Sequence, residues 1–190
     1  HIIKKPAQTP EVYLKLWDTD SQRGPTILKS DLIVLLSATF APDGKTLACV
    51  GADNQGGVVQ LWDVVTQKVE LLRTSSFRAV KAIVFSGDGK KFAIVGHSAG
   101  DRLAGAVNSE HVELWEAMPL KRIAVAAVKL SRANASFSSD MKTLAITGET
   151  VDAGRSVLLW DTVSHRTVKL RGHENRINCV GFSPDGKTIA

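Results

Sequence analysis

The phrase around which the chain is organised is Val157-Leu158-Leu159-Trp160-Asp161. An aliphatic run that ends in tryptophan and an acidic residue returns three more times, at Leu16-Trp17-Asp18, Leu61-Trp62-Asp63 and Leu114-Trp115-Glu116. All four tryptophans occupy this position, at intervals of 45 (17 to 62), 53 (62 to 115) and 45 (115 to 160) residues. A period near 45 residues with one tryptophan per unit predicts an array of similar supersecondary units.

A second phrase recurs in the same phase, between two apolar runs. It reads Phe40-Ala41-Pro42-Asp43-Gly44-Lys45 and Phe182-Ser183-Pro184-Asp185-Gly186-Lys187, with related copies at 85–90 and 137–142. Proline and aspartate suit the central positions of a type I turn, and glycine accepts the left-handed conformation that follows. The phrase predicts a hairpin turn. Met141 replaces the glycine in the third copy and predicts a strained or differently shaped turn there.

Short β-type runs flank each of these phrases, so each unit is expected to hold four strands, the third being the tryptophan phrase. The expected first strands are Val34–Phe40, Ala79–Phe85, Ala133–Phe137 and Ile177–Phe182, and the second are Leu47–Gly51, Phe92–Gly96, Leu144–Gly148 and Ile189–Ala190. The expected fourth strands are Ile27–Ser30, Val69–Arg73, Arg122–Val128 and Thr167–Arg171. No stretch has a sustained helical apolar period, so the predicted fold class is all-β, made of four-stranded antiparallel units.

The Trp-Asp pair, the Ser-Pro-Asp-Gly turn and Gly172-His173 resemble the WD-repeat β-propeller family over nearly the whole chain. The resemblance implies that residues 1–190 form one propeller segment, with repeat phases centred on Trp17, Trp62, Trp115 and Trp160 and a further, truncated repeat that begins near Gly172. We expect three full blades and two partial ones, cut from a larger ring of about seven blades. Closure of the two partial blades into a small four-bladed ring is the alternative.

The chain departs from the family in the hydrogen-bond network of each blade. In the family, a histidine of the Gly-His pair and an aspartate of the following turn connect to the tryptophan of the same blade. Asp53 could serve Trp62, but no histidine matches it, and the sequence ends before the tryptophan that would match His173. We therefore expect the blades to depend on apolar packing. The residues expected to have structural roles are Trp17, Trp62, Trp115, Trp160 and His173.

Composition limits the classes of protein that fit this sequence. Its 190 residues are 44% hydrophobic and 23% charged, as in ordinary globular proteins. The net charge of +5 is a weak indication of nucleic-acid binding. Cys49 and Cys179 lie far apart in apolar runs, which excludes a disulfide framework. The apolar runs are too short to span a bilayer and no secretory signal is visible, so we expect no membrane association and a cytoplasmic location.

No pattern in the sequence carries catalytic chemistry. Residues 181–188 match the phosphate-loop pattern GxxxxGK[ST], but Pro184 removes a backbone donor, Asp185 repels phosphate, and a strand-like run follows. The five histidines are not at metal-ligand spacing. We expect no catalytic residue, cofactor, metal or small-molecule substrate, and hence no enzyme. A propeller enzyme with a site in its central channel remains an alternative.

The connections on one face of the predicted propeller carry the candidate binding residues. The second-to-third-strand loops, at Ala52–Gly57, His97–Glu110 and Glu149–Arg155, emerge there together with basic fourth-to-first-strand loops. Loops on a rigid scaffold are typical of binding sites, although these charges could equally be solvated turns. The opposite face is expected to hold tight Asp-Gly turns that offer little to recognise. The candidate partner-binding residues are Phe77, as an exposed aromatic anchor, Arg78, Asp101, Arg102, Arg132, Arg155 and Arg176.

The sequence thus predicts a non-catalytic scaffold that binds protein or peptide partners through one propeller face. Binding of nucleic acid or another acidic partner through the basic loops is the alternative, and it implies a strong dependence on salt. Nothing in the sequence identifies the partner.

Overall fold

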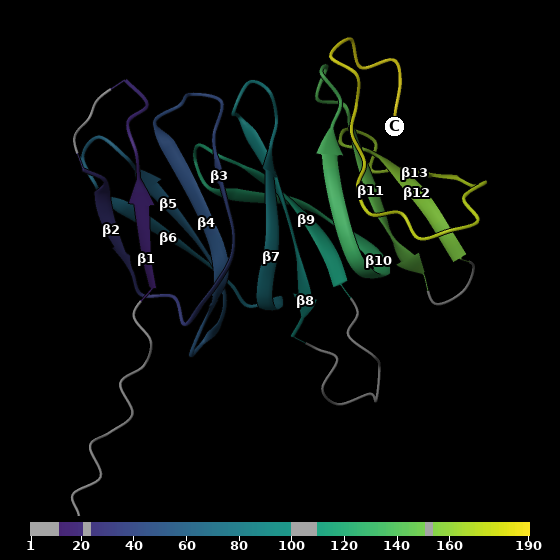
Figure 1. The fold of residues 1–190 in the computed structure, drawn as a ribbon. Helices are drawn as coiled ribbons and strands as arrows, with labels where there is room; N and C mark the ends of the chain where they lie inside the picture. Colours follow the sequence, from purple (N-terminus) through teal and green to yellow (C-terminus); the bar gives the residue numbers. More distant parts are fainter. Residues whose placement is uncertain (1–11, 21–23, 100–109, 151–153) are drawn as a thin grey trace, which may run out of the picture.

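The computed structural model describes residues 12–20, 24–99, 110–150 and 154–190, with the backbone alone at 127–133, 148–150 and 154–155. These residues form thirteen β-strands (Figure 1). The strands are β1 (Val12–Leu16), β2 (Thr26–Ser30), β3 (Val34–Phe40), β4 (Thr46–Asp53), β5 (Gly56–Asp63), β6 (Val69–Thr74), β7 (Phe77–Phe85), β8 (Lys91–Ser98), β9 (Glu110–Glu116), β10 (Lys121–Phe137), β11 (Thr143–Thr150), β12 (Gly154–Asp161) and β13 (Thr167–Leu170). None of the described residues belongs to a helix that could cross a membrane.

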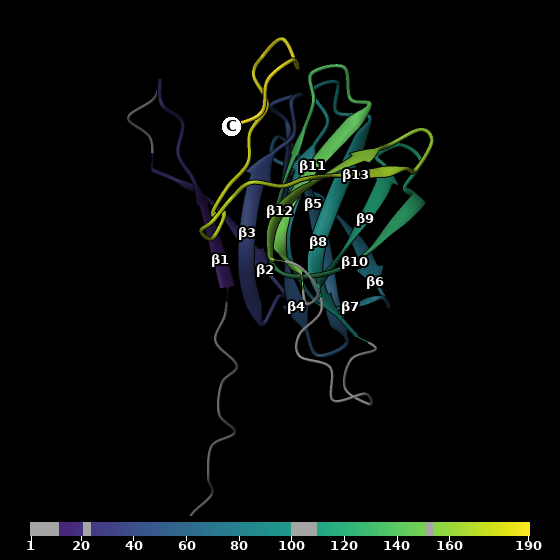
Figure 2. The ribbon, with the colours of Figure 1, turned by 90° about the vertical axis from the view of Figure 1, so that its right-hand side faces the viewer.

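The strands form four antiparallel units, here called blades A to D. Blade A is the pair β1-β2, and blade B is the complete meander β3-β4-β5-β6. Blade C contains β7, β8, β9 and the first half of β10, and blade D contains the second half of β10 followed by β11, β12 and β13. The blades stand side by side, with the Asp-Gly turns at one end and the β4-β5 hairpin at the other (Figures 1 and 2).

Blades C and D share one strand, where the sequence analysis expected two strands and a loop. β10 runs for 17 residues and pairs with β9 through its first half and with β11 through its second. Residues 121–137 contain neither glycine nor proline, so nothing interrupts the strand, and register shifts turn it from one blade to the next. The expectation that Arg132 lies in a loop is therefore wrong, because it lies in this strand.

The C-terminal segment also differs from expectation. The expected strands Ile177–Phe182 and Ile189–Ala190 reduce to one bridge between Phe182 and Ile189, although the hairpin turn between them forms. Val180 packs against Ala145 and Val157 of blade D. The segment thus covers an apolar face of blade D, and among the described residues it pairs only with itself, through the bridge between Phe182 and Ile189.

The core lies between blades, and the tryptophans of blades B, C and D pack toward the preceding blade. Trp62 is 6% exposed among side chains of blades A and B, and Trp160 is 1% exposed among those of blades C and D, as expected. Trp115 is half-buried between blades B and C. Trp17 is 67% exposed, so its expected core role is wrong. In the other blades, the preceding blade covers the tryptophan, and none of the described residues forms a blade before blade A.

The Asp-Gly turns share one backbone shape in all four copies. The fourth residue of each turn has a positive φ: 66° at Gly44, 68° at Gly89, 70° at Gly186 and 59° at Met141. The Met141 N–H bonds the Ser138 carbonyl across 2.9 Å, as the Gly44 N–H bonds that of Ala41 across 3.0 Å. The Met141 turn is therefore strained and of the same shape as the others, because a side chain is held in the left-handed region.

Candidate functional site

The aspartates that follow the tryptophans cap turns. Asp63 Oδ1 accepts the N–H groups of Val65 and Thr66 across 2.9 and 2.8 Å, and Asp161 makes the same two bonds in blade D. The backbone donor of Thr66 is the largest cause that holds the pKa of Asp63 below its usual range. These carboxylates are thus turn-stabilising groups that stay ionised at neutral pH.

Two blades have a polar partner for their tryptophan that the sequence analysis missed. In blade B, the Trp62 Nε1–H donates to Gln60 Oε1 across 3.3 Å, and the hydroxyl of Ser30 donates to the same oxygen across 2.7 Å. Gln60 is 2% exposed. The sequence did contain a signal for this contact, because Gln60 is a polar residue in an otherwise aliphatic strand. It lies two positions before the tryptophan, and residues two apart on a strand point to the same face.

Blade C builds a larger network on a buried carboxylate. Glu113 accepts the indole N–H of Trp115 and an N–H of Arg122, each across 3.0 Å, and is itself fully buried. Arg122 also donates to the hydroxyl of Ser76 across 3.0 Å. Burial raises the pKa of Glu113, but hydrogen bonds led by those of His111 and Ser76 lower it further, so the net pKa lies below its usual range. This network connects β9, β10 and the turn before β7.

The predicted binding face contains a hollow of about 540 Å³, here called the loop-side hollow. Its lining includes the hairpin at Asp53–Gly56, Phe77 and Arg78. Phe77 is 1% exposed and its ring stacks on His111 with centroids 4.0 Å apart, so the expectation of an exposed anchor is wrong. The β7 register turns Phe77 into the core between blades B and C, where it forms the floor of the hollow.

Arg78 is the candidate arginine that the structure places at this hollow. Its side chain is exposed at the start of β7. Nearby, Arg73 forms an ion pair with Asp53. Burial raises the pKa of Asp53, but the hydrogen bond from Arg73 helps to hold it below its usual range.

Among the remaining candidate binding residues, the structure describes the side chain of Arg176 alone. Arg176 and His173 are exposed in the segment after β13, away from the lining of the loop-side hollow. Asp101 and Arg102 lie outside the described residues, and of Arg132 and Arg155 only the backbone is described. Of the predicted binding residues, Arg78 and Phe77 are therefore the two that the structure places at the loop-side hollow.

A charged cluster lies at the same end of blade C. Lys81 Nζ bonds Glu110 Oε1 across 2.6 Å, and His97 Nδ1 lies 3.8 Å from that oxygen. Glu110 is 1% exposed, and burial lowers the pKa of His97. Within the part of the chain that the structure describes, no group of three or more His, Cys, Asp or Glu side chains is arranged to hold a metal ion.

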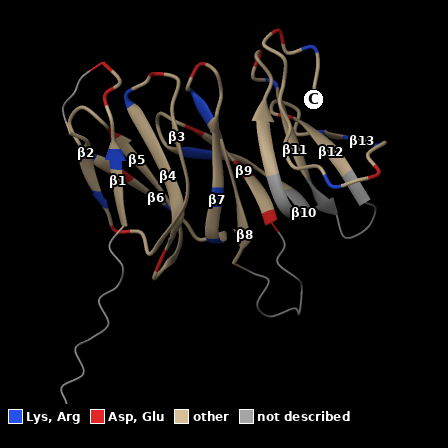
Figure 3. Ribbon diagram, viewed as in Figure 1, with Lys and Arg blue, Asp and Glu red and all other residues tan. Residues whose placement is uncertain are grey.

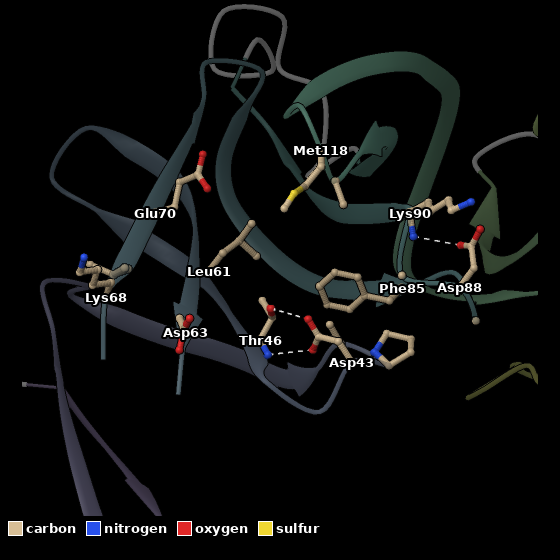
Figure 4. A pocket seen from close by; sticks show the side chains of 16 residues that line it. Asp43, Thr46, Leu61, Asp63, Lys68, Glu70, Phe85, Asp88, Lys90 and Met118 are labelled. Carbon is tan, nitrogen blue, oxygen red and sulfur yellow. Dashed lines mark hydrogen bonds between the residues drawn. The ribbon is translucent and has the colours of Figure 1, made fainter. Parts of the chain in front are cut away.

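The opposite face holds a second hollow, of about 790 Å³, between the Asp-Gly turns of blades B and C (Figure 4). We call it the turn-side groove. Its apolar lining includes Leu61, Val69, Phe85, Ala117 and Met118, and its charged lining is Asp43, Asp63, Lys68, Glu70, Asp88 and Lys90. The sequence predicted little to recognise on this face, because each turn taken alone is small and polar. The groove forms only where two turns and two blades meet.

Comparisons with known proteins agree with this architecture. The family description "WD domain, G-beta repeat" matches residues 164–190. Among solved structures, Kuenenia stuttgartiensis hydrazine synthase is similar with a TM-score of 0.73 at 17% identity over 93% of this chain. TolB from Acinetobacter baumannii is similar with a TM-score of 0.66 at 21% identity over 94% of this chain. The chain spans 60% and 42% of those two proteins, and identities this low show the fold alone. No curated protein matches the chain significantly.

Fold and surface together define an all-β propeller segment made of four-stranded antiparallel blades, a scaffold of the kind generally used for protein binding. Residues 164–190 match one repeat of the WD-repeat family, and the solved neighbours share the β-propeller fold of the chain.

Proposed function

We propose that the chain is a non-catalytic scaffold that binds a protein or peptide partner at the loop-side hollow. The observation that supports this most directly is the exposed Arg78 beside a hollow of about 540 Å³ whose frame is made of paired strands. A guanidinium forms directional, two-pronged bonds with carboxylates, so an acidic side chain of a partner is its natural ligand. The buried Phe77 and His111 stack supports the floor of this site.

The test compares Arg78 and the sequence-predicted Arg102 and Arg132 with lysines of the turn face. Reversal of charge at these three arginines is expected to weaken binding of a captured partner more than tenfold, or about 1.4 kcal/mol. Reversal at Lys45 and Lys187, which are exposed in Asp-Gly turns, is the control. The partner is first captured from cell extract with the wild-type chain, and affinities are then measured by calorimetry with the purified partner. A loss from the lysine variants equal to that from the arginine variants would contradict the proposal.

Nucleic-acid binding is the second candidate, and the net charge of +5 favours it. Contacts with phosphates release counterions, so affinity for a DNA or RNA duplex would then fall steeply with salt, by about tenfold or more between 50 and 200 mM. A protein partner held by a few ion pairs is expected to show a much weaker dependence.

A further inference from the structure

The turn-side groove has an apolar floor that remains open to solvent. Leu61, Phe85 and Ala117 are half-buried at the edge of the core between blades B and C. Val69 is 41% exposed and Met118 is 87% exposed along its sides. Figure 4 shows the side chains of Leu61, Phe85 and Met118 around one space. Several apolar groups that share one concave lining form a better binding surface than scattered single exposures.

Backbone hydrogen bonds hold the walls of the groove in place. The Val64 N–H donates to the Lys45 carbonyl across 2.9 Å in blade B, and the Ala117 N–H donates to the Lys90 carbonyl across 2.8 Å in blade C. These bonds join the two turns at this end of each blade. A Cβ added to Gly89 would lie 3.7 Å from Pro42 Cδ, so the turns of neighbouring blades also meet. The groove is thus formed before any ligand arrives, which lowers the ordering cost of binding.

The rim of the groove is acidic, although the whole chain is basic. Four carboxylates (Asp43, Asp63, Glu70 and Asp88) and two ammonium groups (Lys68 and Lys90) line it, which leaves a charge of −2. Lys45, near Asp43 and Asp63, offsets part of this charge. Acidic residues also mark the tips of successive turns at this end of the molecule (Figure 3). The net charge of the chain is +5, so the groove has the opposite sign to the protein as a whole.

The three aspartates of the rim cannot easily lose their charge. Asp43 Oδ1 accepts the N–H groups of Lys45 and Thr46 across 2.8 and 2.9 Å, and Asp88 Oδ1 accepts the Ser86 hydroxyl across 2.7 Å. Hydrogen bonds of this kind stabilise the ionised form. The turns therefore present fixed negative charges around an apolar floor.

We propose that the turn-side groove binds an extended peptide segment in which one large apolar side chain is flanked by lysine or arginine residues. The apolar side chain would rest on Leu61 and Phe85, beside Met118. The flanking cations would lie near Glu70 and the turn aspartates. This site is separate from the loop-side hollow, and the two can be tested independently.

Fluorescence anisotropy with a labelled heptapeptide, Lys-Arg-Ala-Leu-Ala-Lys-Arg, tests the proposal on the 190-residue chain. We expect the double variant Glu70→Lys with Met118→Gln to bind this peptide about tenfold or more weakly than wild type. Both side chains are exposed, so neither change removes core packing. The matched control is Glu174→Lys with Val163→Gln, since Val163 is 69% exposed at the equivalent turn position of blade D and does not line the groove. The control is expected to stay within about twofold of wild type.

Two further peptides separate the apolar and ionic requirements. Replacement of the central leucine by glycine, or of the four basic residues by glutamate, is expected to weaken binding by about tenfold. Arg78→Glu should leave binding of the basic peptide at wild-type affinity, because Arg78 belongs to the other face. No binding of the basic peptide to wild type, equal binding of the glutamate peptide, or equal losses in the test and control variants would each overturn the proposal.

Discussion

The indole N–H of Trp115 donates to a carboxylate oxygen of Glu113, two residues earlier on the same strand, across 3.0 Å. Trp62 and Gln60 have the same relationship in blade B, across 3.3 Å. Residues two apart on a strand share one face, so a polar residue in this position can reach the indole. Blade D has the buried Leu158 there instead, and Trp160 is enclosed by apolar side chains. The blades thus accommodate their tryptophans in two different ways.

The first prediction concerns the pH dependence of stability. The folded pKa of Glu113 lies below the usual 4.5, so its ionised form stabilises the fold above about pH 4.5. This contribution is lost as pH falls through the folded pKa, because the unfolded chain binds the proton first. At pH 7, Glu113→Gln should lower the free energy of unfolding by about 1–3 kcal/mol, since Arg122 and Trp115 keep an acceptor but lose the charge. Urea melts at several pH values should show the difference from wild type shrinking below pH 4.5. A difference that does not change with pH would contradict this account.

The second prediction contrasts two tryptophans in equivalent positions. Trp160→Ala should cost about 3–5 kcal/mol, because it leaves a cavity between blades C and D. Trp17→Ala, at a side chain that is 67% exposed, should cost less than about 1 kcal/mol. Chemical denaturation of the two variants beside wild type measures both values. Equal costs would show that burial is not what distinguishes the two positions.

The third prediction follows from the turn at Met141. A side chain at a φ of 59° costs about 1–2 kcal/mol, so Met141→Gly should stabilise the chain by about 0.5–1 kcal/mol after the entropy cost of glycine. The reciprocal control is Gly44→Ala, at a φ of 66° with open space around the added Cβ. It should destabilise the chain by about 1 kcal/mol through strain alone. Thermal melts test both variants, and a destabilising Met141→Gly would mean that the methionine side chain makes a compensating contact.

The fourth prediction concerns a glycine at a close approach of two strands. A Cβ added to Gly51 on β4 would overlap the backbone oxygen of Val34, next to the register shift in β3. Because backbone cannot yield as a flexible side chain does, Gly51→Ala should cost about 1–3 kcal/mol or more. Gly87→Ala is the control, since its added Cβ meets nothing within 4 Å. Denaturant midpoints that fall equally in both variants would rule out the steric explanation.

Much of the fold could be predicted because its determinants are local and repeat along the chain. The predicted strand Val34–Phe40 has the observed bounds of β3, and Val69–Arg73 lies within β6. The Asp-Gly turns lie where the proline, aspartate and glycine pattern indicates, with glycine or methionine at positive φ. Turn chemistry and strand alternation act over a few residues, so one sequence was enough to predict them.

The binding surfaces depend on contacts that a single sequence does not show. Phe77 was predicted to be exposed. In the structure, the pairing of β7 with β8 contains two register shifts, and the side chain of Phe77 points into the core. The turn-side groove exists because Leu61 of blade B and Phe85 of blade C, 24 positions apart, meet beside the same two turns. Each depends on the position of a neighbouring blade, and blade neighbours are set by packing over long sequence separations.

By itself, the sequence determined the repeat phase, most of the strand positions in blades B to D and the all-β class, because an alternating apolar strand between turn residues has few other ways to fold. Only the tertiary structure decided which tryptophans are enclosed, that β10 joins two blades without a loop, and that Glu113 lies at the centre of a buried polar network. The physical reason is common to all three. A blade buries its apolar faces only against other blades, so exposure and polar partners are properties of the interface and not of the strand.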